Sequence, residues 1–106
     1  MPRDKATKFD KGKLRMDLIP AVVFRSLAKV FGDGAAKYGD NNYQQGILWS
    51  RYYAALLRHL VAWWDGEDKD PDSGFHHLEH VLCNAEILVF FALGDYSSFD
   101  DRPGRK

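Results

Sequence analysis

The chain has 106 residues, which is the length of one domain, and its 15 basic and 15 acidic residues give a formal net charge of zero. No overall positive field therefore attracts DNA or RNA, and we expect no nucleic-acid partner. The lone Cys83 excludes an intrachain disulfide and fits a cytoplasmic location, while no apolar run is long enough to predict a signal peptide or a membrane span.

The hydrophobic content is high for a small helical domain. Hydrophobic residues make up 45% of the chain and aromatic residues 14%. This content is enough for a core but generous for three helices. This surplus favours a homo-oligomer.

The first third of the chain predicts a helix followed by a loop. Apolar residues recur at helical spacing between residues 19 and 31, with Pro20 in the first turn. Gly32 and Gly34 are expected to weaken or end this helix. Residues 35–38 predict one further helical turn, followed by a loop rich in amides and glycine.

Side chains around this loop are suited to a planar base. Tyr38 and Trp49 offer aromatic faces for stacking, and Asn42 offers an amide for hydrogen bonds. Lys37 is a candidate phosphate ligand beside them. The alternative is that the aromatic residues only cover the helices.

Residues 50–64 predict the second long helix, with Ser50 as its N-cap and an end before Gly66. One broad face of this helix is apolar. The opposite face sets Arg51 and Arg58 two turns apart on a strip of small residues. This strip is either solvated surface or a flat basic surface that a phosphate can approach.

The third helix is predicted to begin near Ser73 and to run from Phe75 to about Leu93. Its buried face is expected to be a stripe of apolar residues, with Glu79 and Glu86 on the outer side. The residues of this stripe are Leu78, Val81, Leu82, Ala85, Leu88, Val89 and Ala92.

Three polar side chains follow one edge of this third helix, where a cleft between helices is expected. His77, His80 and Asn84 occupy positions i, i+3 and i+7, and His59 of the second helix is expected to face them. Imidazoles at this spacing can share a metal ion or an anionic ligand, although a histidine at a helix edge is more often structural.

The loop that joins the second and third helices is acidic. Residues 65–72 contain five carboxylates, and Glu67 or Asp70 can serve a divalent cation. Acidic loops are otherwise simply solvated. Together the elements predict an all-α domain of three main helices with a short helical turn, and a site between the second and third helices or at a subunit interface.

Several motifs follow one another in a familiar order. Lys-Gly-Lys-Leu-Arg-Met-Asp-Leu-Ile-Pro at 11–20 precedes Lys-Tyr-Gly-Asp-x-Asn-Tyr at 37–43 and Trp-Ser-Arg-Tyr-Tyr-Ala-Ala at 49–55. Arg-His-Leu-x-Ala-Trp at 58–63, Gly-Glu-Asp-x-Asp at 66–70, Ser-Gly-x-x-His-Leu-x-His at 73–80 and Asn84 then follow. This succession, covering roughly residues 11–93, resembles the phage and prophage family of dATP/dGTP diphosphohydrolases, N-terminal domain.

The resemblance implies chemistry similar to that of the MazG-like all-α pyrophosphohydrolases. These cleave nucleoside triphosphates to monophosphate and pyrophosphate with magnesium or manganese. It implies action on dATP and dGTP, phage nucleotide metabolism and a location in the host cytoplasm. The nucleotide-binding domain is expected over residues 11–94, between a flexible basic segment 1–10 and a flexible tail 95–106.

MazG-like enzymes mark their metal site by Glu-x-x-Glu on one helix and Glu-x-x-Asp on the next, and this chain has neither pair. The Mg²⁺ or Mn²⁺ ion is therefore expected on a different set of ligands. The candidate ligands are Glu67, Asp70, His77, His80 and His59.

In the expected reaction, water attacks the α-phosphorus and pyrophosphate leaves. Glu67 and Asp70 are the candidate catalytic carboxylates, and Glu67 orients the water. Tyr38, Asn42 and Trp49 hold the base. The expected clamp on the phosphates consists of Lys13, Arg15, Lys37, Arg51 and Arg58.

Two other functions fit the same residues. A non-catalytic phage protein that sequesters a nucleotide or a cyclic-nucleotide immune signal would use the same basic and aromatic side chains, and it predicts binding without turnover. A purely structural helical oligomer predicts no nucleotide binding.

Overall fold

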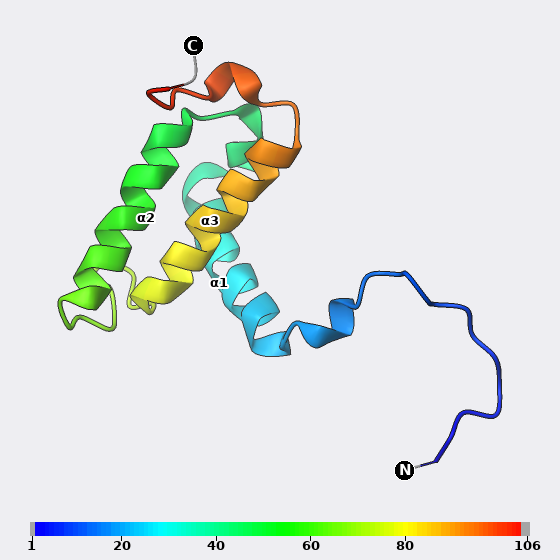
Figure 1. The fold of residues 1–106 in the computed structure, drawn as a ribbon. Helices are drawn as coiled ribbons and strands as arrows, with labels where there is room; N and C mark the ends of the chain where they lie inside the picture. Colours follow the sequence, from blue (N-terminus) through cyan, green and yellow to red (C-terminus); the bar gives the residue numbers. More distant parts are fainter. Residues whose placement is uncertain (1, 105–106) are drawn as a thin grey trace.

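The computed structural model describes residues 2–104 and is all-helical, without a sheet in that range. Its helices are α1 (Ala21–Tyr38), α2 (Trp49–Trp64) and α3 (His77–Leu93). The helices α2 and α3 form a hairpin, and α1 packs along α3 (Figure 1). The predicted all-α class is confirmed. None of the described helices has the length and hydropathy needed to cross a membrane.

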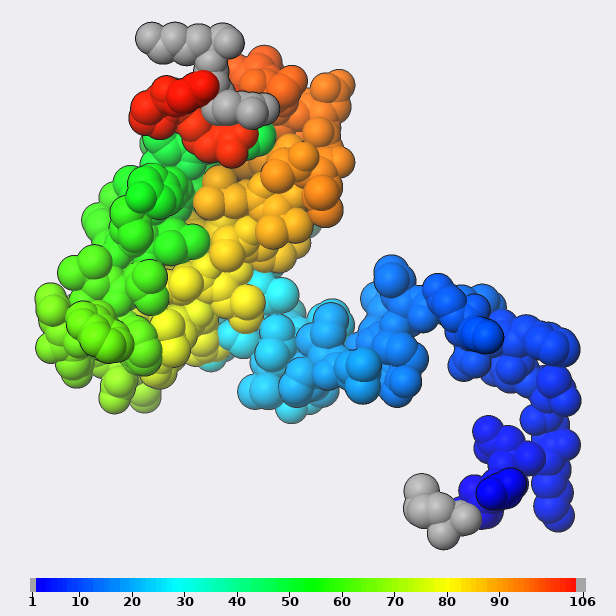
Figure 2. Space-filling view, in the orientation of Figure 1, coloured from blue at the N-terminus to red at the C-terminus, as the bar shows by residue number. Residues whose placement is uncertain are grey.

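Three short 3₁₀ helices complete the secondary structure of the described residues. They are Met16–Leu18 before α1, Asn42–Gln45 between α1 and α2, and Ser97–Phe99 after α3. The residues before α1 extend away from the helices (Figures 1 and 2).

Gly32 and Gly34 were expected to weaken or end the first helix, and they do not end it, because α1 continues through both glycines to Tyr38. Each glycine costs a helix about 1 kcal/mol relative to alanine. Packing of Val30, which is buried, and of Phe31 against the core offsets this cost. The i,i+4 ion pair between Lys37 and Asp33, 3.2 Å long, supports the last turns from outside.

The start of α2 differs from the prediction by its cap. The helix begins at Trp49, so Ser50 lies in its first turn and is not the N-cap. The N–H of Ser50 donates to the Asp101 carboxylate at 2.9 Å, and the Ser50 hydroxyl donates to the same group. A negative charge at the N-terminus of α2 therefore comes from a residue 51 positions later.

The start of α3 is set by a capping box. The helix begins at His77, later than the predicted start, and His76 is its N-cap. The His76 side chain accepts from the Leu78 N–H at 3.0 Å, and the Glu79 carboxylate accepts from the His76 N–H at 3.2 Å. Ser73 and Phe75 instead belong to the turn that leads into the helix.

The outer position predicted for Glu79 and Glu86 is also wrong. The Glu79 carboxylate accepts hydrogen bonds from Ser26 at 2.7 Å and Lys29 at 2.9 Å, both on α1. Glu86 is half-buried, and burial raises the pKa of its carboxyl group. The contact between Glu79 and α1 ties the beginning of α3 to the first helix.

The buried face of α3 is not the predicted stripe. Its buried residues are His77, Cys83, Ile87 and Phe91, whereas Val89 in the predicted stripe is 53% exposed. The helix is apolar on nearly every side, so periodicity alone could not select the face that α1 and α2 cover. Cys83 is a free thiol buried on this face.

Residues 95–102, expected to belong to a flexible tail, pack against the start of α2 and the loop before it. The Tyr96 hydroxyl donates to the Gln44 carbonyl at 2.7 Å. The Phe99 ring lies against Gly46, and the Arg102 guanidinium lies 5.0 Å above the Trp49 ring. The division into segments 1–10, 11–94 and 95–106 stays a prediction.

Replacing Glu79 tests how firmly α3 is held. Glu79→Ala removes the capping box and the contacts to α1, and we expect it to lower the free energy of unfolding by about 1–3 kcal/mol in urea titrations. Partial burial opposes ionisation of Glu79, but the hydrogen bonds from Lys29 and Ser26 outweigh it and lower its pKa.

A lowered carboxylate pKa stabilises the fold above the unfolded pKa, about 4.3 for glutamate, and this contribution is lost as the pH falls through the folded value. The stability gap between wild type and Glu79→Gln should therefore shrink below that pH. A gap that stays constant from pH 7 to pH 3 would contradict the role of the charge.

Candidate functional site

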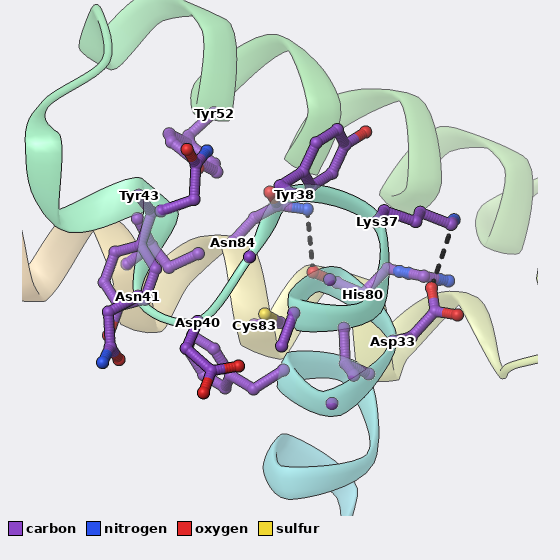
Figure 3. Close-up of a pocket in the computed structure, with 18 residues that line it drawn as sticks. Asp33, Lys37, Tyr38, Asp40, Asn41, Tyr43, Tyr52, His80, Cys83 and Asn84 are labelled. Carbon is purple, nitrogen blue, oxygen red and sulfur yellow. Dashed lines mark hydrogen bonds and ion pairs between the residues drawn. The ribbon is translucent and has the colours of Figure 1, made fainter.

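A cavity of about 460 Å³ lies between the end of α1, the loop that follows it and the middle of α3 (Figure 3). This volume is typical of small-molecule sites. Aromatic walls come from Phe31, Tyr38, Tyr43 and Tyr52. The polar side chains that line the cavity are Asp33, Lys37, Asp40, Asn41, Asn42, His80 and Asn84.

Charge in this cavity is unevenly distributed. Among the described lining residues, Lys37 is the one lysine or arginine, and Asp33 and Asp40 are carboxylates. Figure 3 shows Lys37 directed at Asp33, and this contact raises the pKa of the lysine. An anionic ligand in this cavity therefore requires additional positive charge.

Beside the cavity, two histidines and a carboxylate meet where α2, α3 and their connecting loop converge. His59, Asp70 and His80 can each offer one ligand atom such that all three atoms lie within 4.8 Å of one another. The two imidazole rings stack with their centroids 4.3 Å apart. Asp70 Oδ2 lies 4.0 Å from His59 Nδ1 and 3.7 Å from His80 Nε2.

The connecting loop holds Asp70 in place. The Asp70 N–H donates to the Phe75 carbonyl at 2.8 Å, and the Gly74 N–H donates to the Asp70 carbonyl at 2.7 Å. The Asp72 N–H donates to Asp70 Oδ1 at 2.9 Å and lowers the pKa of that carboxyl group. An ionised carboxylate is thus positioned before any ligand arrives.

Both histidines of the cluster favour the neutral form. Burial and the neighbouring His80 lower the pKa of His59. Burial also lowers the pKa of His80, and it outweighs the opposing charge of Asp70. Neutral imidazoles keep a nitrogen lone pair, so the three groups form a donor set for a divalent transition-metal ion.

A hydrogen-bonded chain connects this cluster to Glu67. The buried His77 places its Nε2 atom 2.6 Å from Glu67 Oε1 and its Nδ1 atom 2.9 Å from His59 Nδ1. The Glu67 side chain is 52% exposed. A carboxylate at the surface is therefore coupled through one buried histidine to a residue of the cluster.

The structure brings most of the predicted site residues into two adjoining places. His59, Asp70 and His80 form the cluster, with His77 one hydrogen bond and Glu67 two hydrogen bonds from it. The other predicted residues that lie nearby line the cavity, and they are Lys37, Tyr38 and Asn42.

Other predicted residues lie elsewhere. Trp49 packs against the hydrophobic core under Arg102 and is not part of the described cavity wall. Arg51 and Arg58 are exposed on α2. The remaining pair, Lys13 and Arg15, lies in the extended segment before α1.

Two contacts at the site were absent from the sequence prediction. Ser73 Oγ lies 2.7 Å from His80 Nε2, and the Asn84 side chain donates to the His80 carbonyl at 2.8 Å. Tyr52 lines the cavity. Its position seven residues before His59, on the same face of α2, was the signal in the sequence.

Two comparisons with known proteins indicate the same family. The family model described as dATP/dGTP diphosphohydrolase, N-terminal, matches residues 3–102. A protein of Salmonella phage PMBT28, named dATP/dGTP diphosphohydrolase, is 33% identical over 95 residues. That match covers 90% of this chain and 32% of the relative, so the chain spans about a third of the relative's length. No solved structure matches the chain.

The hydrogen-bonded chain predicts the tautomers of two histidines. An ionised Glu67 only accepts, so His77 Nε2 must carry a proton. In a neutral His77, Nδ1 then accepts, and His59 must carry its own proton on Nδ1. Long-range ¹H–¹⁵N spectra at about pH 8 should show this pair of tautomers. An Nε2–H tautomer at His59 would contradict the arrangement.

Proposed function

The chain belongs to the dATP/dGTP diphosphohydrolase N-terminal family, and we propose that it hydrolyses dATP and dGTP to monophosphate and pyrophosphate with a divalent metal ion, in phage nucleotide metabolism. This proposal rests on the position of His80. His80 lines the cavity and also belongs to the cluster with His59 and Asp70. A nucleoside in the cavity therefore directs its phosphates towards the cluster.

The cavity walls suit the nucleoside. Tyr38 and Tyr43 supply aromatic faces, and Asn42 supplies an amide that both donates and accepts hydrogen bonds. Asn84 uses its nitrogen on the His80 carbonyl, so its oxygen is left to accept from a ligand. Trp49 takes no part in this binding mode.

The donor set of the cluster fits a transition-metal ion better than magnesium. His59 and His80 offer imidazole nitrogens and Asp70 offers a carboxylate oxygen. Magnesium prefers oxygen ligands, whereas manganese accepts nitrogen as well, so we propose Mn²⁺ as the better cofactor. The bound ion supplies positive charge that offsets the charge of the triphosphate.

Glu67 is the proposed general base. Its half-exposed carboxylate can accept a proton from water while the water oxygen attacks the α-phosphorus and the bond to the pyrophosphate oxygen breaks. The contact with His77 fixes the direction of this carboxylate. Lys37, the one lysine or arginine among the described residues that line the cavity, is proposed to bind the phosphates.

Turnover by site variants tests the proposed function. We expect wild type to release pyrophosphate and monophosphate from dATP and dGTP with Mn²⁺ but not with EDTA, measured by ion-exchange chromatography. His80→Ala should lower kcat/KM on the order of 100-fold or more. Glu67→Gln should remove turnover while nucleotide binding, followed by calorimetry, persists.

A histidine outside the cluster provides the matched control. His76→Asn keeps a good N-cap for α3 and should retain activity close to wild type. Full activity in Glu67→Gln would remove Glu67 from the reaction. Tight binding of unchanged nucleotide by wild type, with or without metal, would instead indicate a sequestering protein.

A further inference from the structure

The segment before α1 exposes large apolar side chains. Residues 9–19, here called the arm, leave the base of α1 and extend away from the α2–α3 hairpin (Figures 1 and 2). Every residue of the arm is exposed. The large apolar members and their exposed fractions are Phe9 at 85%, Leu14 at 87%, Met16 at 65%, Leu18 at 67% and Ile19 at 47%.

The arm has local structure of its own. The Arg15 guanidinium donates two hydrogen bonds to Asp17, at 2.9 and 2.8 Å, and the Lys13 N–H donates to the Asp10 carbonyl at 3.0 Å. The 3₁₀ helix Met16–Leu18 follows. Within residues 2–104, no hydrogen bond or ion pair joins the arm to the three helices.

One protomer is less compact than its length predicts. Its radius of gyration is 17.7 Å. A compact domain of 100 residues has a radius of gyration of about 13 Å. A group of large apolar side chains this exposed is uncommon on monomeric proteins and indicates a contact surface. We therefore expect a surface outside its own protomer to cover the arm.

A matching surface lies at the far end of the hairpin. The loop of residues 65–72, here called the acidic loop, has five carboxylates and the single cation Lys69. Beside it on α2, Val61 is 56% exposed and Trp64 is 79% exposed. This surface thus combines negative charge with apolar area.

The arm presents the complementary pattern. The arm has three cations, Lys11, Lys13 and Arg15, and two carboxylates, Asp10 and Asp17. Arg15 is paired with Asp17, whereas neither lysine makes an ion pair within the described residues. Opposite charges on two surfaces that also carry apolar area fix both the partner and the register of docking. Figure 1 shows the arm on the side of α1 away from its own acidic loop, so the loop of another protomer is the candidate partner.

We propose that the arm docks on the acidic loop and the adjoining end of α2 of a second copy of this chain. Two such contacts form a symmetric dimer in which each protomer gives an arm and receives one. The arm then brings Lys11 and Lys13 to the neighbourhood of the partner subunit's acidic loop. If the proposed function holds, these lysines add positive charge near the cluster to which Asp70 of that loop belongs.

Sedimentation velocity and cross-linking of the full-length chain test this proposal without nucleotide or metal. Wild type should sediment as a dimer at about 100 µM, and Leu14→Glu should weaken the dimer by about tenfold or more. Leu93→Glu is the matched control, because Leu93 is 84% exposed at the end of α3, far from the arm. Both variants should keep the helical circular dichroism of wild type.

Cross-linking distinguishes docking in the partner from docking in the same chain. An equal mixture of ¹⁴N and ¹⁵N protein is treated with a carbodiimide, which joins lysine amines to carboxylates in contact. Links from Lys11 or Lys13 to the acidic loop should include pairs of unlike isotope. A monomeric wild type, a dimer that Leu93→Glu but not Leu14→Glu dissociates, or links between like isotopes alone would each overturn the proposal.

Discussion

Burial of His77 constrains everything around it, because a buried imidazole needs partners for both ring nitrogens. Glu67 and His59 are those partners, at 2.6 and 2.9 Å. One comes from the connecting loop and the other from α2, so a single buried ring fixes the loop, α2 and α3 relative to one another. The same contacts orient His59 towards Asp70 and His80.

Backbone hydrogen bonds make this arrangement possible. The His77 N–H donates to the Asp68 carbonyl at 2.8 Å, and Lys69 pairs with His76 in an isolated β-bridge. These contacts fold the acidic loop back on the start of α3 and place Asp70 beside the stacked rings of His59 and His80, which come from different helices. The three side chains of the cluster are therefore already held together, which would reduce the cost of assembling a metal site there.

Sequence patterns predicted the helices and much of the site for identifiable reasons. Spacing at i and i+3 placed His77 and His80 on one side of the third helix, and the apolar face of residues 50–64 brought His59 towards them. The order of motifs indicated the family, which the match over residues 3–102 confirms.

The features that local sequence patterns did not predict depend on residues that are distant in the sequence. Asp101 supplies the negative charge at the start of α2. Arg102 lies over the Trp49 ring, so the tryptophan that was expected to bind the nucleotide base has a different contact. The buried face of α3 was likewise undetermined, because nearly every side of that helix is apolar. Gly32 and Gly34 lie within a continuous helix because tertiary packing outweighs their low helix propensity.

Pulsed electron paramagnetic resonance of Mn²⁺ in the presence of a dGTP analogue with a nitrogen bridge between its α and β phosphates is the most direct measurement. If His80 joins the nucleotide cavity to the metal cluster, the spectrum should show two histidine nitrogens and a phosphorus coupled to the same ion, and His80→Ala should remove one nitrogen. Phosphorus coupling without histidine nitrogen would contradict the account, because the nucleotide alone would then hold the ion.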